Sequence, residues 1–561
     1  MNSAGIIDLV PAELRAQWVT DGTYPDKTVY ALFCEHAATQ PDTPAVLSPE
    51  LTLSYAQLLD KVRRLANSLK RLGIVPGDTV AYQLSNSWRS CAIDLAVAAL
   101  GGVVAPFPPG RGRLDIEALL RNSGARAIII EPEFGGIDFC EMVESIRPKA
   151  LSLRFLIANG DRRNNWLSLD EMFADSPVHD DELPEVCPDS PVRMLVSSGT
   201  ESEPKLVAYS HNALIGGRGR FLQRIHNDGK TFRGMYLIPL GSSFGSTATF
   251  GILCWLGGSV VVLPKFDPDA VLQAIERFRP SYVLGVPTMF QRMLAAESLT
   301  GCDLSSLQAI ISGGSLIDKT TIDRCMQAFG CGFISLYGSA DGVNCHNLLN
   351  EGLDVVSYSV GRPNPGVCDI RIVDDLHKDV PQGSIGEIAA RGPLSPMQYV
   401  NAEQLDARYR DSQGWVYTGD LGFIDTRGYL VLAGRKKDII IRGGTNISPV
   451  QIENLATSHP DVVSAACVPV ADPDLGHRIC ICLSLKPGAE RLSLAQITGY
   501  LTDRGLEVNK LPEFLSYFSQ MPLSPAGKLD KKQMTGELGW LAPDVPCNSE
   551  TETNALAGGA A

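Results

Sequence analysis

Short apolar runs alternate with amphipathic segments through the first four hundred residues, and this alternation is what most limits the fold of the chain. Five runs have the length and composition of strands: Thr79–Gln83, Ala127–Ile130, Val192–Ser197, Tyr282–Val286 and Ala309–Ser312. Strands that alternate with helices favour layered α/β structure with mostly parallel pairing. Because ligands of such sheets bind at the carboxyl ends of strands, we predict an α/β fold whose functional residues follow its strands.

One helix can be predicted with both of its ends. Ser54 and Gln57 have the spacing of a capping box, and Gly73 ends the pattern that follows. Between these ends, apolar residues recur at intervals of four and three: Leu58, Val62, Leu65, Leu69 and Leu72. This spacing predicts a helix with one apolar stripe packed against the rest of the fold.

The length of 561 residues exceeds what one hydrophobic core organises, so several domains are expected. The sequence predicts a large N-terminal domain, residues 1–434, built of layered α/β subdomains. A small, mobile α+β domain is expected at residues 435–541. The last segment, residues 542–561, has few groups to bury, and this composition predicts a disordered tail.

Charge and cysteine usage exclude several classes of function. The net charge of −14 argues against a nucleic-acid partner, because phosphate backbones are bound by basic surfaces. The fourteen cysteines lack zinc-site spacing, and no signal peptide is recognised, so we expect reduced thiols in the cytoplasm. The longest apolar run, Phe250–Pro264, is interrupted by glycines and is too short to cross a membrane.

A turn of small, hydroxyl-bearing residues follows one of the predicted strands: Ser197, Ser198, Gly199 and Thr200. Such a turn offers backbone N–H groups and hydroxyl donors to phosphate oxygens, and Lys205 adds a cation nearby. It is not a Walker A loop, because Pro204 stands directly before the lysine where that motif has glycine.

Five motifs occur in order along the chain: SSGTESEPK, SLYGSADG, VYTGD, GRKKDIIIRGGTNISPVQIE and PLSPAGKLDKK. Together they resemble the adenylate-forming superfamily, in particular its acyl-CoA synthetases and aryl-acid-AMP ligases. The resemblance implies that a carboxylate attacks the α-phosphate of ATP, and that a thiol then displaces AMP from the acyl-AMP. It implies ATP, Mg²⁺ and coenzyme A as cofactors. Since two anions must meet, the protein must supply positive potential.

The resemblance also implies roles for particular residues. Lys528 corresponds to the lysine that bridges the acyl carboxylate and the α-phosphate, and Thr200 and Lys205 are expected beside the phosphates. Asp420 and Arg435 correspond to ribose-binding residues, and Tyr337 to the aromatic ring stacked on adenine. The remaining nucleotide-binding positions are Ser197, Ser198 and Gly199 of the hydroxyl-bearing turn, together with Gly313, Gly314, Ser315, Gly338, Ser339 and Ala340.

Asp341 stands where the family usually has a glutamate that reaches Mg²⁺. The shorter acid keeps the charge and loses one methylene of reach, so we expect a metal role for it that is direct or through water. Lys437 matches the hinge about which the small domain moves. That motion would withdraw Lys528 and bring a loop containing Arg442, Gly443 and Gly444 to the coenzyme A tunnel, where glycine allows close approach of pantetheine.

The phosphate turn departs from the family pattern at Glu201, Ser202 and Leu206. A carboxylate about 5 Å from one phosphate charge costs about 3 kcal/mol at an effective dielectric constant near 20. Together with Asp341, this charge leaves open a second reading, in which the protein performs only the thioester step and uses acyl-AMP from a separate adenylating enzyme. A third reading, independent of the turn, is that the protein loads a carrier protein in trans. A non-catalytic nucleotide- or acyl-binding protein is the least expected.

By resemblance, the acyl pocket is formed by the stretches 242–249, 285–288, 312–315 and 339–346, with Ser242, Phe244, Gly285 and His346 as its candidate residues. Ser242 replaces a histidine that many relatives have. No lysine or arginine occurs in these stretches. The sequence therefore favours a bulky, mainly apolar carboxylic acid as the substrate.

Overall fold

The computed structural model describes residues 5–197, 204–226, 229–315, 317–442, 445–523 and 529–538, with the side chains of 197, 445 and 446 left aside. The expected tail, residues 542–561, lies outside these ranges. Contacts divide the chain into two compact units, and the division falls between Leu432 and Ala433.

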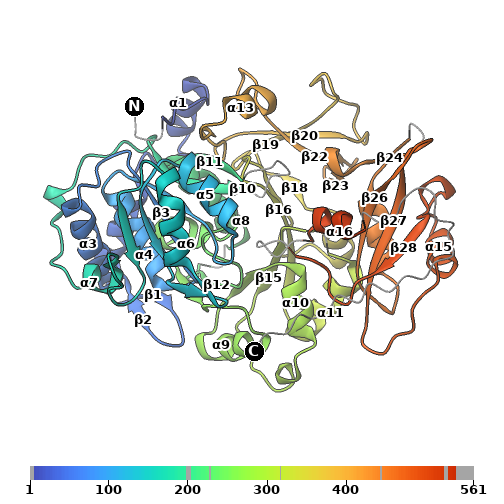
Figure 1. Ribbon diagram of the computed structural model, residues 1–561, viewed down its shortest axis with the longest axis horizontal. Helices are drawn as coiled ribbons and strands as arrows, with labels where there is room; N and C mark the ends of the chain where they lie inside the picture. The colour runs from blue at the N-terminus through green and yellow to red at the C-terminus, as the bar shows by residue number, and fades with distance from the viewer. Residues whose placement is uncertain are drawn as a thin grey trace. The chain divides into compact units, whose positions relative to one another are not determined.

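The first unit contains a sheet of nine described strands (Figure 1). In spatial order the strands are β18 (Arg362–Pro363), β17 (Asn344–His346), β16 (Gly332–Gly338), β15 (Ala309–Gly313), β14 (Tyr282–Gly285), β12 (Arg233–Tyr236), β13 (Ser259–Val262), β1 (Pro44–Leu47) and β2 (Thr52–Ser54). The strands from β16 to β1 pair in parallel, and antiparallel strands flank them at both ends. The carboxyl ends of β12, β14, β15 and β16 therefore lie along one edge.

A second sheet of the same unit has eight described strands. They are β21 (Gln398–Tyr399), β11 (Lys205–Ser210), β10 (Pro191–Ser197), β4 (Val103–Pro106), β3 (Thr79–Gln83), β5 (Ala125–Ile130), β8 (Phe155–Ala158) and β9 (Leu167–Ser168). The run from β10 to β9 is parallel, whereas β11 pairs antiparallel with β10 and β21. All five strands expected from the sequence occur in these two sheets, with ends shifted by two residues or fewer.

Helices surround the two sheets, as the alternation of strands and helices predicts. They are α1 (Ala12–Thr20), α2 (Val29–Thr39), α3 (Tyr55–Arg71), α4 (Trp88–Ala99), α5 (Arg113–Asn122), α6 (Phe139–Ile146), α7 (Leu169–Phe173), α8 (Arg220–Ile225), α9 (Pro268–Phe278), α10 (Pro287–Leu294), α11 (Lys319–Phe329), α12 (Leu353–Tyr358) and α13 (Glu403–Tyr409). Among them, α4 packs on β4, α5 on β5, and α11 and α12 on β16. The layered α/β fold is thus confirmed.

The helix whose start and end were both predicted from the sequence is α3. Its capping box is formed: the Gln57 N–H donates to Ser54 Oγ at 3.3 Å, and the Ser54 N–H donates to Gln57 Oε1 at 2.9 Å. Of its apolar stripe, Leu58, Val62, Leu65 and Leu69 are buried, and the C-cap residue Leu72 is half-buried. Gly73, just beyond the helix, has a φ of +84°, a conformation that favours glycine. Local signals alone were sufficient here.

The apolar run Phe250–Pro264 forms two elements rather than one. Its first part belongs to a π-helical segment, η4 (Ala248–Leu256), and its second part to β13. A second π-helical segment, η3 (Ala213–Gly219), packs against η4. Gly219 permits this contact, since a Cβ there would lie 2.9 Å from the Trp255 ring. Over the described ranges, no helix has the length and apolar character that a membrane crossing requires.

Two smaller sheets complete the described structure, besides the short pair β6 (Glu133–Phe134) and β7 (Ile137–Asp138). One comprises β19 (Asp369–Val373), β20 (Gly386–Arg391), β22 (Val416–Ile424) and β23 (Leu430–Arg435). The sheet of the second unit comprises β25 (Thr445–Ile447), β24 (Ile440–Arg442), β27 (Gly476–Leu485), β26 (Val462–Asp472) and β28 (Phe514–Tyr517). Helices α14 (Pro449–Thr457), α15 (Leu494–Asp503) and α16 (Lys531–Glu537) belong to this α+β unit.

Candidate functional site

The carboxyl edge of the large sheet gathers several of the predicted site residues. Gly285 at the end of β14 is paired with Ser312 on β15, and Gly313 is paired with Leu336 on β16. A Cβ on Gly313 would lie 3.2 Å from the ring of Phe244, so the loop after β12 reaches the same edge. Stretches that are far apart in sequence therefore meet at the place where α/β sheets bind ligands.

Buried polar side chains hold the loop after β12 in place. The Asn86 amide donates to Ile238 O at 2.9 Å and accepts from the Leu240 N–H at 2.7 Å. The Arg193 guanidinium donates to Leu240 O at 2.8 Å. Because Asn86 and Arg193 are both buried, these bonds fix the backbone of the loop before it reaches the predicted acyl residues.

Arg193 is itself half of an ion pair inside the first unit. Its guanidinium lies 2.6 Å from Asp94 Oδ2, and the two side chains are 0% and 2% exposed. The Asp94 carboxylate also accepts from the Thr249 hydroxyl at 3.0 Å and from the Tyr82 hydroxyl at 3.1 Å. The pair connects α4, β10 and η4 to the loop after β12. The sequence analysis did not predict this ion pair.

The hydroxyl of Ser242 is used within its own turn. It donates to Pro239 O at 2.7 Å and accepts from the Gly245 N–H at 3.0 Å. Gly245 is required here, since a Cβ at this position would lie 2.0 Å from Pro239 O. Ser242 therefore shapes the loop at the point where the family pattern has a histidine.

The residues predicted to bind adenine and ribose lie side by side. The Tyr337 hydroxyl, at the end of β16, donates to Asp420 Oδ2 on β22 at 2.8 Å. Both residues are largely buried, at 8% and 5% exposure. The Asp420 N–H donates to Thr418 Oγ1 at 3.1 Å, which orders the turn that carries the carboxylate. Of the glycine-rich turn after β15, Gly314 has a φ of +87° and Ser315 is exposed.

Asp341 and Lys205 meet at an aromatic cluster. Asp341 Oδ1 accepts from the Tyr399 hydroxyl at 2.7 Å, and the Asp341 N–H donates to Ser339 Oγ at 3.1 Å. The Lys205 ammonium lies 4.5 Å from the centre of the Tyr409 ring and 5.8 Å from that of Tyr399. Burial, and then the carboxylate beside it, raises the pKa of Tyr399, so this hydroxyl remains a donor.

The donor set at Asp341 fits a metal bound chiefly by a nucleotide. One carboxylate oxygen accepts from Tyr399, and the other accepts no hydrogen bond from the described residues. In the part of the chain that the structure describes, no group of three or more His, Cys, Asp or Glu side chains could hold a metal ion. Mg²⁺ at this position would therefore take most of its ligands from phosphate oxygens and water, as it commonly does with nucleotides.

His346 is buried next to the ring of Phe221, whose centre lies 5.8 Å from that of the imidazole. Its Nδ1 lies 3.0 Å from Asn347 O, which is consistent with donation from Nδ1 to that carbonyl oxygen. The Nε2 atom has no hydrogen-bond partner within the described residues. Burial lowers the pKa of His346 to about 4.

Replacing His346 with glutamine should weaken the pH dependence of stability. An exposed histidine in the unfolded chain has a pKa of about 6.5. Between this value and about 4, the unfolded chain binds a proton that the folded chain does not. The wild-type protein should therefore lose up to about 1.4 kcal/mol of unfolding free energy per pH unit from this group as the pH falls. Unfolding curves at pH 7, 6 and 5 measure the difference.

The exposed His179 provides the matched control for this prediction, as His179→Gln in the same unit. The slope for His346→Gln should be smaller than the slopes of both the wild type and His179→Gln. Equal slopes for all three proteins would contradict a low pKa for the buried imidazole.

The predicted residues of the second unit are only partly described. Arg435 is the last residue of β23, and Lys437 lies in a 3₁₀ turn, Lys436–Asp438. Arg442, placed by the sequence in the coenzyme A tunnel, donates from Nε and from its terminal nitrogen to Glu513 Oε1, at 2.9 and 2.6 Å. The candidates Ser198, Gly199, Thr200, Gly443, Gly444 and Lys528 lie outside the described residues, and of Ser197 only the backbone in β10 is described.

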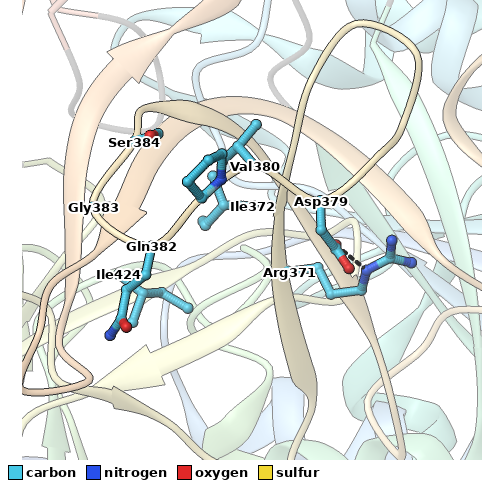
Figure 2. A pocket seen from close by; sticks show the side chains of 9 residues that line it. Arg371, Ile372, Asp379, Val380, Gln382, Gly383, Ser384 and Ile424 are labelled. Atoms are coloured by element: carbon cyan, nitrogen blue, oxygen red, sulfur yellow. Dashed lines mark hydrogen bonds and ion pairs between the residues drawn. The ribbon is translucent and has the colours of Figure 1, made fainter.

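A cavity of about 310 Å³ lies elsewhere, between β19 and the turn that leads to β20. Figure 2 shows Arg371 and Asp379 joined at this cavity, with 2.6 Å between guanidinium and carboxylate. Gln382 and Ile424 also line it. None of the predicted site residues lines this cavity. We therefore assign no function to it.

A layered α/β unit with a cluster of polar residues at the carboxyl ends of its strands is typical of α/β proteins that bind a ligand at this edge. Residues 33–400 match the AMP-binding enzyme family, and residues 451–528 match the AMP-binding enzyme C-terminal domain. The chain belongs to this adenylate-forming family, and the resemblance seen in the motifs is confirmed. The protein is accordingly an adenylate-forming ligase, an enzyme that activates a carboxylic acid.

Three known proteins illustrate the range of similar enzymes. The chain is 29% identical over 542 residues to a 2-hydroxy-7-methoxy-5-methyl-1-naphthoate–CoA ligase of Streptomyces carzinostaticus, covering 94% of this chain and 96% of that one. It is 29% identical over 539 residues to a salicyl-AMP ligase / salicyl-S-ArCP synthetase of Mycobacterium tuberculosis, covering 94% of each. The amide bond synthetase McbA of Marinactinospora thermotolerans has a similar structure, with a TM-score of 0.80, 26% identity and coverage of 91% and 100%.

Proposed function

We propose that this protein is an AMP-forming acid–thiol ligase that activates a bulky, mainly apolar carboxylic acid and transfers the acyl group to coenzyme A. The observation that carries the proposal is the pairing of Tyr337 with Asp420 next to the loops of the predicted acyl pocket. Adenine and ribose would bind at this pair, and the acid would bind beside it at the same sheet edge. The similarity to a naphthoate–CoA ligase supports a bulky acid and coenzyme A.

The proposed reaction has two steps. The carboxylate of the acid attacks the α-phosphorus of ATP, the bond to the β-phosphate breaks, and pyrophosphate leaves. The thiol of coenzyme A then attacks the carbonyl of the acyl-AMP, loses its proton, and AMP leaves. In the first step Lys528, Thr200 and Lys205 would hold the carboxylate and phosphates, Asp341 would bind Mg²⁺, and Arg435 would contact the ribose.

We further propose that residues 435–541 act as the mobile domain, with Lys437 at its hinge. Gly434 has a φ of +121°, and a Cβ there would lie 2.8 Å from Ser448 Oγ. A backbone that only glycine adopts easily supports a specialised conformation next to the hinge. Arg442, Gly443 and Gly444 would line the path of pantetheine in the thioester-forming state, and Arg442 would then exchange Glu513 for the cofactor.

A second candidate function rests on Glu201 and Ser202. The added negative charge at the phosphate turn opposes the β- and γ-phosphates of ATP, whereas acyl-AMP lacks these groups. The protein could then receive acyl-AMP from a separate adenylating enzyme and form only the thioester. A carrier-protein thiol is a second candidate acceptor. It is supported by the name of one relative, salicyl-AMP ligase / salicyl-S-ArCP synthetase.

A two-stage assay separates these functions. The first stage measures pyrophosphate release with ATP, Mg²⁺ and a panel of aryl and fatty acids, and the second measures thioester formation with coenzyme A or a carrier protein. We expect acid-dependent pyrophosphate release followed by a coenzyme A thioester. Thioester formation from synthetic acyl-AMP without pyrophosphate release from any acid would favour the second function. An acyl product on the carrier alone would replace coenzyme A as the acceptor.

A further inference from the structure

Arg218 ties together the two loops that meet at the proposed site. It lies in η3 and is 7% exposed. Its guanidinium donates to Ser243 O at 2.9 Å, to Ser243 Oγ at 3.2 Å and to Ser339 O at 3.0 Å. Ser243 belongs to the loop after β12, and Ser339 to the loop after β16. One side chain thus bridges the stretch predicted to bind the acid and the stretch predicted to bind the nucleotide.

The positive charge of Arg218 has only neutral oxygens as hydrogen-bond acceptors among the described residues. The guanidinium carbon lies over the ring of Tyr209, 5.1 Å from the ring centre, and so makes a cation–π contact. The Nε atom has no hydrogen-bond partner in the described ranges. Since a guanidinium has five N–H groups, two of them, one at Nε and one on a terminal nitrogen, make no hydrogen bond among the described residues. Burying a charge with no ion of opposite sign is costly, which favours an anionic ligand.

Sequence reasoning missed this arginine because Arg218 lies outside all the stretches expected to form the acyl pocket. Arg218 comes from the segment between β11 and α8. Only the tertiary structure brings it to Ser243, which is next to the position where the family's histidine is replaced by Ser242. A large polar group is therefore present at this loop after all, supplied by another part of the chain.

We propose that Arg218 binds the reacting carboxylate of the acid substrate, at the junction of the acyl and nucleotide loops. This inference rests on the proposed function, because it names the group of the acid that the chain recognises. A guanidinium presents parallel N–H groups that match a carboxylate. The junction is where the carboxylate must approach the α-phosphate, and a fixed positive charge there lowers the repulsion between the two anions.

Binding of matched acids and amides tests the proposal without relying on turnover. Benzoate, salicylate and 2-naphthoate are compared with their primary amides by calorimetry on the full-length protein, with and without AMP. Charge-assisted hydrogen bonds are worth about 1.5–3 kcal/mol, which corresponds to about 10- to 100-fold in affinity. The wild-type protein should prefer at least one acid over its amide by this factor. Arg218→Gln should remove the preference, and Arg218→Lys should retain part of it.

Arg220→Gln is the matched control, since Arg220 also donates to backbone oxygens, including Thr23 O at 3.1 Å. It should keep the wild-type preference. A wild-type protein without any preference for carboxylates, or an Arg218→Gln variant that keeps it, would overturn the proposal. Equal loss of acid and amide binding in Arg218→Gln, with a lower melting temperature, would instead assign Arg218 to holding the loops and would also overturn it.

A dicarboxylic acid distinguishes the reacting carboxylate from a remote one. If Arg218→Gln weakened binding of terephthalate but not of benzoate, Arg218 would bind a second carboxylate, and the assignment to the reacting group would be wrong. The failure of the proposed function has a different signature. An Arg218-dependent preference for acids, together with no pyrophosphate release from any acid, would keep Arg218 as a carboxylate-binding residue but would reject the proposed function and, with it, the assignment to the reacting group.

Discussion

Replacing Asp94 with asparagine should destabilise the first unit by about 3–5 kcal/mol, because the substitution leaves a buried guanidinium without its anion. Arg193 is fully buried and lies 2.6 Å from the carboxylate. Asparagine has almost the same shape, so the loss comes from charge rather than from a cavity. Urea unfolding of the wild type and the variant, followed by tryptophan fluorescence, measures the difference. Because Arg193 also holds Leu240 O, the variant should in addition bind acids more weakly.

Two further proteins sharpen this prediction. Asp354→Asn removes the same charge from an exposed ion pair, in which Asp354 is 90% exposed and its partner Lys319 is 58% exposed. It should change stability little, since exposed pairs contribute little. The double variant Asp94→Leu/Arg193→Met should recover much of the lost stability, because apolar groups can replace a buried pair. If Asp94→Asn were no more harmful than Asp354→Asn, the buried pair would not be a structural element of this unit.

Replacing Lys528 with alanine should reduce adenylation by about 100- to 1,000-fold, the range found when one preorganised donor to a developing charge is removed. The proposal gives Lys528 a role only in the first step, where it neutralises the carboxylate and the α-phosphate. Thioester formation from synthetic acyl-AMP should therefore be almost unchanged. Pyrophosphate exchange measures the first step, and thioester release from acyl-AMP and coenzyme A measures the second.

Lys532→Ala is the control for Lys528, because Lys532 belongs to the same motif and is exposed on α16. Its rates in both steps should equal those of the wild type. Equal losses of Lys528→Ala in both steps would contradict a role confined to adenylation, and unchanged pyrophosphate exchange would remove Lys528 from the proposed mechanism.

Much of the fold follows from local patterns. The ends of α3 are encoded in Ser54, Gln57 and Gly73, and each makes the local interaction or backbone conformation that its position requires. Five strands of the two large sheets could be found for a similar reason, since a fully buried strand needs a short, continuous apolar run. The order of five motifs was enough to indicate the family, which the match over residues 33–400 confirms.

Which distant residues meet is a different kind of information. Tyr337 and Asp420 are 83 positions apart, Asp94 and Arg193 are 99 apart, and Arg218 and Ser339 are 121 apart. No periodicity records such pairs, because they depend on the order of strands in a sheet and on how η3 packs. Sequence therefore determined the family, five of the strands and both ends of one helix. The tertiary structure alone decided which charges are buried together, since only packing removes water from between them.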